Sequence, residues 1–293
     1  MEQPDSDRAA WEAIGAAIAR IGGGDGRITA REPVGGGCIG AAWSLRTAGG
    51  DWFVKLGPGD PADEADGLQR LATCDALRTP QVHAHGRCGD TGWLLLERIE
   101  LRRRDPRCDE RLGRALAELH RITATRFGLE RDNRIGATAQ PNGRLDDWAT
   151  FWRERRIGFQ LRLAADHGVR FAAGERLLGR IDDLLDGHRP VPSLLHGDLW
   201  SGNAAADADG VPVLFDPAVW FGDRECDLAM AELFGGFDDR FDAAYREAWP
   251  LDAGYPRRRD LYQLYHVLNH VNLFGGGYVA QAERLIGRLL AAA

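Results

Sequence analysis

The sequence predicts an α+β protein with two unequal lobes: a small antiparallel sheet with one main helix, then a larger, mostly helical lobe. Apolar and polar residues alternate in short runs up to residue 96, as they do in half-buried strands. From residue 109 the apolar residues recur at spacings of three and four, as at Leu112, Leu116 and Leu119, which is typical of amphipathic helices. We therefore place the N-terminal lobe at residues 1–96, a hinge at 97–101 and the C-terminal lobe at 102–293.

The elements of the N-terminal lobe follow from periodicity and turn residues. Ile14, Ile18 and Ile21 share one face of a first helix over residues 11–21. Gly49-Gly50 closes a hairpin between two alternating runs, and a glycine cluster at residues 35–40 precedes that hairpin. The main helix of this lobe is predicted at residues 62–71, and the strands are predicted at 28–34, 43–45, 52–56, 81–85 and 93–96.

The C-terminal lobe is predicted to hold long helices around a short, polar, strand-containing stretch. Its two strands are expected near residues 194–196 and 213–215. The arginine runs at 102–104 and 257–259 are interpreted as solvated faces. Helices are expected at 112–119, 146–163, 175–185, 227–233, 238–249, 257–274 and 280–290.

Composition excludes several classes of protein. The 293 residues carry 37 basic and 44 acidic side chains, a net charge of −7, which argues against nucleic acid as a partner. No uncharged apolar run reaches the roughly 18 residues that a membrane-spanning helix needs, and the N-terminus lacks the order of a secretion signal. The five cysteines are odd in number and lack CxxC spacing, so we expect a cytoplasmic protein without a disulfide scaffold or a zinc site.

Lys55 is distinctive because the other 36 of the 37 basic residues are arginine. A position that stays lysine indicates a need for a compact ammonium group rather than a planar fork, with chance survival of one lysine as the alternative. Lys55 ends an alternating run that follows the G-x-G-x-x-G pattern of residues 35–40. This pattern precedes a hairpin, whereas in a dinucleotide-binding unit it opens a helix, so a kinase-type phosphate loop is favoured. We expect Glu64 to orient Lys55, with Asp63 and Asp66 as alternatives.

Residues 196–203, His-Gly-Asp-Leu-Trp-Ser-Gly-Asn, match the H-x-D-L-x-x-x-N catalytic loop of protein kinases, with Gly in place of Arg. In that pattern Asp198 accepts the proton of the attacking hydroxyl and Asn203 binds Mg²⁺. Asp216, in Phe-Asp-Pro, stands where the D-F-G motif is expected and offers a second oxygen ligand for the metal.

Strand register independently predicts that Asn203 and Asp216 lie together. If Asp209-Gly210 forms a two-residue turn, an antiparallel hairpin closed there places Asn203 directly opposite Asp216. Facing residues have Cβ atoms about 4.5–5.5 Å apart, close enough for two oxygens to share a cation. A bulge, or Pro212 in the ladder, would change this pairing.

Other residues near these motifs have alternative interpretations. Trp200 and Trp220 either stack on a substrate or pack in the core, and His196 is a third candidate for the substrate site. Asp227 is interpreted as the N-cap of the helix that follows it. His120, His266 and His270 are interpreted as packing residues.

Taken together, these motifs resemble the fructosamine 3-kinase (ketosamine 3-kinase) family of protein-kinase-like phosphotransferases. The resemblance covers most of the chain and includes Glu-Leu-Phe-Gly-Gly-Phe at 232–237 and the asparagine- and glycine-rich run at 269–278, which general kinase motifs do not require. The matching segments are residues 35–39, 53–55, 195–203, 215–218, 222–225, 232–237 and 269–278.

The resemblance implies ATP- and Mg²⁺-dependent phosphorylation of the sugar 3-hydroxyl of ketosamines, as free metabolites or on glycated proteins. A kinase of the same fold for another hydroxylated amine, such as an aminoglycoside, and a non-catalytic nucleotide-binding module are the alternatives. The family resemblance also implies that Cys38 forms redox-sensitive disulfide dimers. The nucleotide-binding residues that it implies are Gly35, Gly36, Gly37, Cys38, Ile39, Lys55, Glu64 and, in the adenine-binding hinge, Glu97, Arg98 and Ile99.

Overall fold

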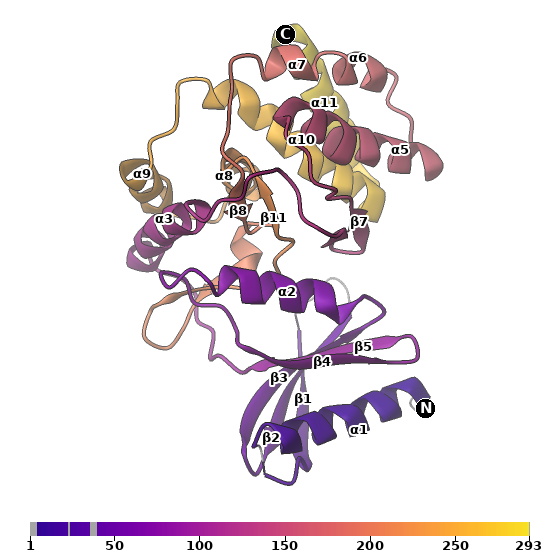
Figure 1. The fold of residues 1–293 in the computed structure, drawn as a ribbon, viewed down its shortest axis with the longest axis vertical. Helices are drawn as coiled ribbons and strands as arrows, with labels where there is room; N and C mark the ends of the chain where they lie inside the picture. The colour runs from indigo at the N-terminus through magenta and orange to yellow at the C-terminus, as the bar shows by residue number, and fades with distance from the viewer. Residues whose placement is uncertain (1–4, 23, 36–39, 293) are drawn as a thin grey trace.

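The computed structural model describes residues 5–22, 24–35 and 40–292, and it has the two expected lobes (Figure 1). The N-terminal lobe is built on a five-stranded antiparallel sheet with the order β1-β2-β3-β5-β4. Its strands are β1 (Ile28–Val34), β2 (Ala41–Thr47), β3 (Gly50–Gly57), β4 (Val82–Cys88) and β5 (Thr91–Glu97). The glycine cluster joins β1 to β2, and residues 36–39 within it lie outside the described residues.

Two helices cover opposite faces of this sheet (Figure 1). On one face α1 (Asp5–Arg20) buries Ile14 and Ile18 against Val54 and Leu95. On the other face α2 (Pro61–Leu71) buries Leu68 with Leu94, Leu96 and Ala65. Neighbouring strand residues therefore pack against different helices, because successive side chains of a strand point to opposite faces of the sheet.

Helix α2 lies between the sheet and the helical lobe (Figure 1). Its start is set by Asp60, whose Oδ1 accepts a hydrogen bond from the Ala62 backbone N–H at 3.0 Å, and by Pro61 in the first turn. Gly67 faces the helical lobe: a Cβ atom there would lie 2.9 Å from Cγ of Pro217. Both lobes therefore contact this one helix.

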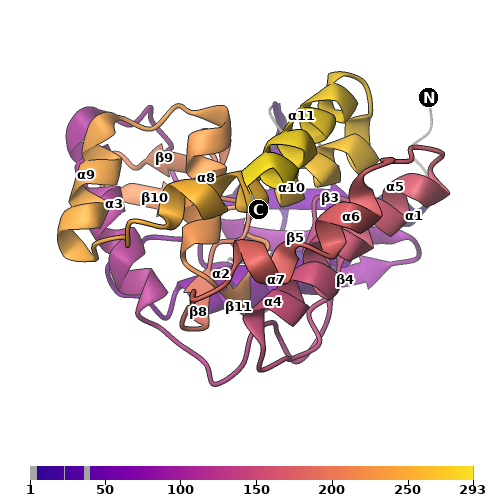
Figure 2. The same ribbon diagram turned by 90° about the horizontal axis from the view of Figure 1, so that it is seen from above.

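The C-terminal lobe is mostly helical and encloses the largest hydrophobic core. Helices α3 and α9 pack together on one side of the lobe, and α5, α6 and α7 lie on the other side (Figure 2). Its helices are α3 (Pro106–His120), α4 (Trp148–Phe151), α5 (Gly158–Asp166), α6 (Gly174–Leu178), α7 (Ile181–Leu184), α8 (Glu225–Phe234), α9 (Asp239–Ala248), α10 (Tyr255–Phe274) and α11 (Gly277–Ala292).

Local structure departs from the predicted elements in two places. The expected helix at 146–163 contains a π-helical segment, Trp152–Ile157, between α4 and α5, and the one at 175–185 divides into α6 and α7 around Gly179 and Arg180. Three short antiparallel pairs also occur: β6 (Asn133–Ile135) with β7 (Thr138–Gln140), β8 (Ser193–Leu195) with β11 (Trp220–Gly222), and β9 (Ala204–Ala206) with β10 (Pro212–Leu214). Among the described residues, no helix has both the length and the apolar character needed to cross a membrane.

Candidate active site

Lys55 lies on the face of β3 that is turned toward α2, and it contacts two carboxylates. Its Nζ donates to Oε1 of Glu64 at 2.6 Å and forms an ion pair with Asp216. Burial lowers the pKa of Lys55, but the negative charges of Glu64 and Asp216 outweigh burial and raise it above its ordinary value. The side chain is therefore a stable ammonium ion that joins the two lobes.

Among the three acids considered as partners of Lys55, the structure selects Glu64. Burial raises the pKa of Glu64, and Lys55 opposes that effect. Asp63 pairs with Arg131 at 3.0 Å, and Asp66 pairs with Arg70 at 2.8 Å, so both acids face away from Lys55.

Two glycines of the phosphate-loop motif lie at the borders of the described residues. Gly35 follows β1 directly, and Gly40 precedes β2. Gly40 has a φ of +92°, and a Cβ atom there would lie 2.5 Å from the carbonyl oxygen of Leu56, so this position requires glycine. Gly36, Gly37, Cys38 and Ile39 lie outside the described residues.

Asp227 holds the start of the catalytic loop. Its carboxylate oxygens accept hydrogen bonds from the backbone N–H groups of His196 at 2.7 Å and Gly197 at 2.9 Å, and Nε2 of His120 lies 3.1 Å from Oδ2. These contacts, with the nearby histidines, hold the pKa of Asp227 below its usual value despite burial. The prediction that Asp227 is an N-cap is wrong, because α8 already begins at Glu225.

Asp198 and Asn203 are joined directly within this loop. Nδ2 of Asn203 donates to Oδ2 of Asp198 at 3.0 Å and to its backbone carbonyl at 2.9 Å. Burial raises the pKa of Asp198 to about 7, with a smaller opposing effect from the Asn203 hydrogen bond. A carboxylate with a pKa near neutrality is suited to accept a proton at physiological pH.

The hairpin register differs by one position from the predicted register. Leu214 pairs with Ala204, so Asn203 lies opposite Phe215, whose N–H donates to the Asn203 carbonyl at 3.1 Å. The turn has three residues, 208–210, because Oδ1 of Asp207 accepts from the backbone N–H groups of Asp209 and Val211.

Asn203 and Asp216 nevertheless lie close together. Asp216 follows the ladder with a φ of +56°, and Nδ2 of Asn203 is 3.5 Å from its carbonyl oxygen. The predicted proximity therefore arises from the sharp backbone turn at Asp216 and not from cross-strand pairing.

The donor set fits a hard divalent cation. Within the described chain, Oδ1 of Asn203 accepts no hydrogen bond, and Asp216 keeps 42% of its side chain exposed. Neutral amide and carboxylate oxygens are ligands that Mg²⁺ accepts alongside phosphate oxygens. These residues therefore have the chemistry to hold Mg²⁺.

Two of the three candidate substrate residues are buried and were assigned wrongly. His196 is fully buried, with Nε2 3.0 Å from the Phe215 carbonyl and Nδ1 accepting from the Asp198 N–H, and burial lowers its pKa. Trp220 is 1% exposed and stacks on Phe151, with the Arg156 guanidinium 4.0 Å from its ring. Both side chains shape the core beneath the catalytic loop.

Trp200 stays a candidate for substrate contact. It is half-buried, and its ring meets the ring of Phe234 edge-on at 6.4 Å.

The hinge begins where β5 ends. Oε1 of Glu97 accepts from Nη2 of Arg78 at 2.7 Å, and Arg78 also pairs with Asp207, which directly precedes the turn of the β9–β10 hairpin. Nε of Arg98 donates to Oγ of Ser44 at 2.8 Å. The contact of Glu97, Arg98 and Ile99 with adenine stays a prediction.

Arg104 supports the catalytic loop through contacts that the sequence did not reveal. Its side chain is 7% exposed, and its Nε donates to Oδ1 of Asp109 at 2.6 Å. Its Nη1 donates to the carbonyls of Ser201, at 3.1 Å, and Ala204, which border Asn203, and its Nη2 donates to Gly236 at 2.9 Å. The interpretation of the arginine runs as solvated faces is wrong for Arg104 and for the buried Arg258.

His188, Asp223 and Glu225 form a second cluster of potential metal ligands in the described part of the chain, but their acceptor atoms are occupied. Glu225 uses both carboxylate oxygens for Arg258, each at 2.7 Å. Oδ2 of Asp223 accepts from Tyr262 at 2.5 Å and lies 2.6 Å from Nε2 of His188, while Oδ1 accepts from the Glu225 N–H. This cluster is an internal ion-pair network.

Comparison with known proteins finds relatives that match nearly the whole chain. The family model described as fructosamine kinase matches residues 10–292. A probable ketoamine kinase from Synechocystis is 41% identical over 292 residues, covering 98% of this chain and 99% of the relative. The chloroplastic protein-ribulosamine 3-kinase of Arabidopsis thaliana is 41% identical over 270 residues, covering 89% of this chain and 82% of the relative.

A solved structure from Haemophilus somnus, provisionally named a fructosamine-3-kinase, is also similar. It has a TM-score of 0.90 and 31% sequence identity, and the match covers 96% of this chain and 97% of the other. The family match spans the sheet lobe, the catalytic loop and the C-terminal helices alike. Because the family model matches residues 10–292 and relatives are 41% identical along most of the chain, the chain belongs to the fructosamine kinase family.

Proposed function

We propose that this protein is an ATP-dependent kinase that phosphorylates the sugar 3-hydroxyl of ketosamines such as fructosamines and ribulosamines. The observation that carries the proposal is the convergence of Lys55 and Glu64 from the sheet lobe with Asp198, Asn203 and Asp216 from the helical lobe. The names of relatives about 40% identical over nearly their full length support ketosamines as the acceptor class.

The residues of the site divide the task into positioning and proton transfer. Asp198 accepts the proton of the attacking hydroxyl, and Asn203 fixes the orientation of its carboxylate. Lys55 holds the nucleotide phosphates, and Glu64 keeps its ammonium group in place. When Mg²⁺ is bound, held by Asn203 and Asp216, it supplies charge neutralisation at the phosphates.

An aromatic wall beside the catalytic loop offers a surface for the acceptor. We define it as Trp200, Phe234, His270, Phe274 and Tyr278. The rings of Phe234 and His270 lie 5.0 Å apart, and those of His270 and Tyr278 lie 4.9 Å apart. Phe234 and Phe274 are 39% and 55% exposed, so the wall presents aromatic surface on which the apolar face of a sugar or of its amine substituent can stack.

The test is phosphotransfer from ATP to ribulosyl-lysine and fructosyl-lysine, with the position of the new phosphate located by NMR. We expect phosphorylation at the 3-hydroxyl. Asp198→Asn should lower kcat at least about 100-fold while MgATP binding persists, because the variant lacks the general base. Arg126→Met, which removes an exposed ion pair with Asp146, serves as the control with unchanged activity.

Other outcomes would overturn parts of this proposal. Full activity of Asp198→Asn would reject the assigned base. Turnover of an aminoglycoside or another hydroxylated amine, but of no ketosamine, would replace the acceptor class. Absence of Mg²⁺-dependent stabilisation by ATP would indicate a non-catalytic module. The cytoplasmic location and the redox-linked dimer through Cys38 stay predictions.

A further inference from the structure

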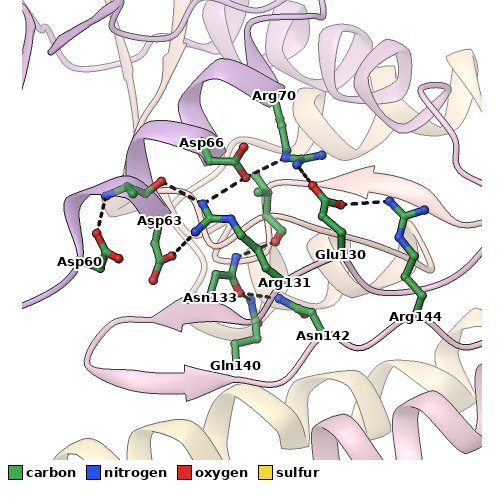
Figure 3. Close-up of polar contacts among 12 residues, drawn as sticks. Asp60, Asp63, Asp66, Arg70, Glu130, Arg131, Asn133, Gln140, Asn142 and Arg144 are labelled. Atoms are coloured by element: carbon green, nitrogen blue, oxygen red, sulfur yellow. Dashed lines mark hydrogen bonds and ion pairs between the residues drawn. The ribbon is translucent and has the colours of Figure 1, made fainter. Parts of the chain in front are cut away.

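Helix α2 presents opposite faces to two different charged partners. Glu64 pairs with Lys55 of β3. Asp63 and Asp66 point toward Arg131 of the helical lobe (Figure 3). The segment that meets these two acids is residues 130–133, which leads into β6. Since Asp63 and Glu64 are adjacent in sequence, any force that holds Asp63 also restricts Glu64.

Arg131 makes the central contact between this segment and α2. Its Nη1 donates to Oδ1 of Asp63 at 3.0 Å, and its Nη2 donates to the backbone carbonyl of Ala62 at 3.1 Å and lies 3.5 Å from Oδ2 of Asp66. One guanidinium group therefore contacts two acids and the backbone of the first helical turn. This geometry uses the planar fork of arginine, which a lysine does not possess.

A second arginine extends the contact along α2. Nε of Arg70 donates to Oδ2 of Asp66 at 2.8 Å, and its Nη2 forms an ion pair with Glu130. Glu130 also accepts from Nη2 of Arg144 at 3.0 Å (Figure 3). The acids and arginines thus alternate across the boundary between the lobes.

The far side of segment 130–133 is anchored to residues 217–219, the segment between Asp216 and β11. Nδ2 of Asn133 donates to the carbonyl of Val219 at 2.9 Å, and Nε2 of Gln140 donates to the carbonyl of Ala218 at 3.1 Å. Oδ1 of Asn133 accepts from Gln140 at 2.8 Å and from Asn142 at 2.7 Å (Figure 3). The polar side chains of this anchor are buried, so its geometry is well defined.

We propose that Arg131 is a positioning residue that fixes α2 against the helical lobe and so keeps Glu64 on Lys55, thereby setting the affinity for MgATP. The inference rests on the proposed kinase function, because it assigns Lys55 to the nucleotide phosphates. Arg131 would thus influence nucleotide binding without contacting the nucleotide. Through α2 and Glu64, the helical lobe would determine the position of Lys55 in the sheet lobe.

The size of the effect follows from the exposure of the contacts. A single half-exposed ion pair contributes little, because solvent screens it, so no one contact would suffice. Arg131 combines three contacts, and without it the Asp63 side chain, which is 16% exposed, loses this ion-pair partner, whereas Asp66 keeps Arg70. We therefore expect Arg131→Met to weaken MgATP binding about tenfold, which corresponds to about 1.4 kcal/mol.

The experiment measures the dissociation constant of MgATP by calorimetry and the KM for ATP and ketosamine. Arg131→Met should raise Kd and KM for ATP about tenfold and leave KM for the ketosamine unchanged. Arg131→Lys should recover part of the affinity. Arg126 is a half-exposed arginine whose acidic partner, Asp146, lies away from α2. The control variant Arg126→Met should therefore have the wild-type Kd and KM values.

A double-mutant cycle separates positioning from general destabilisation. If Arg131 acts through Glu64, then Arg131→Met should change the MgATP Kd less than about twofold in a Glu64→Gln background. A full tenfold effect in that background, or a wild-type Kd for Arg131→Met itself, would overturn the inference. Failure of the kinase proposal is distinguishable, because the wild type would then bind MgATP without phosphorylating any ketosamine.

Discussion

Asp198 shows how burial prepares a side chain for its role. Its carboxylate is enclosed by the catalytic loop, which raises its pKa to about 7, and its hydrogen bond from Asn203 only partly offsets burial. Burial in the folded protein therefore disfavours the ionised form of the Asp198 carboxyl group. A base with this pKa is half ionised near neutrality, where proton transfer is most sensitive to pH.

This pKa predicts an acid limb in the activity profile. Asp198 must be ionised to accept a proton, so the rate should fall about tenfold per pH unit below pH 7 and level off above it. The measurement is the initial rate from pH 5.5 to 8.5 with both substrates well below their KM, which reports groups of the free enzyme. A flat profile between pH 5.5 and 7 would contradict the assignment of Asp198.

At the residue scale, the candidate site residues that lie within short motifs could be predicted from the sequence. Lys55, Asp198, Asn203 and Asp216 lie in patterns whose spacing reflects the chemistry, so their proximity was expected before the fold was known. Arg104 lies in a run of three arginines that looks like solvent-exposed charge. Its burial depends on acceptors about 100 residues away, which no local pattern contains.

At the element scale, periodicity located the long helices and the main sheet, whereas among the short strands only those near β8 and β10 were expected. Three-residue strands such as β9 and β11 are too short to show alternation. The β9–β10 register was missed by one position because the Asp207 side chain caps a three-residue turn. Turn length decides register, and one additional residue moves every pairing.

Helix α2 gives a prediction at this scale. A Cβ atom at Gly67 would lie 2.9 Å from Pro217 Cγ and 3.6 Å from Val219 Cγ2, so Gly67→Ala should push α2 away from the segment between Asp216 and β11. We expect the MgATP Kd to rise about threefold to tenfold, because overpacking costs about 1–3 kcal/mol and exceeds the roughly 1 kcal/mol that alanine gains in a helix.

The matched control is Gly287→Ala in α11, where no neighbouring atom lies within 4 Å of the added Cβ. That variant should raise the melting temperature and leave MgATP binding unchanged. If both substitutions leave the nucleotide Kd at the wild-type value, the close packing of α2 on the helical lobe does not control the site.

At the scale of the whole molecule, the site depends on contacts between lobes that local patterns do not reveal. Arg131 and Asp63 are 68 residues apart, and Lys55 and Asp216 are 161 apart. The two-lobed architecture was predictable because its local elements and motifs follow kinase order. The ion pairs between the lobes could not be predicted, because charged residues are frequent throughout this sequence and no local pattern indicates which of them pair.

The measurement that tests the central claim most directly is a crystal structure of the wild-type protein with Mg²⁺ and a non-hydrolysable ATP analogue. We predict that Mg²⁺ lies about 2.0–2.1 Å from Oδ1 of Asn203 and from a carboxylate oxygen of Asp216. Lys55, still paired with Glu64, should contact the phosphates, with Asp198 facing the terminal phosphate. A nucleotide bound elsewhere, or bound with Lys55 and Asp216 both out of contact, would contradict the account.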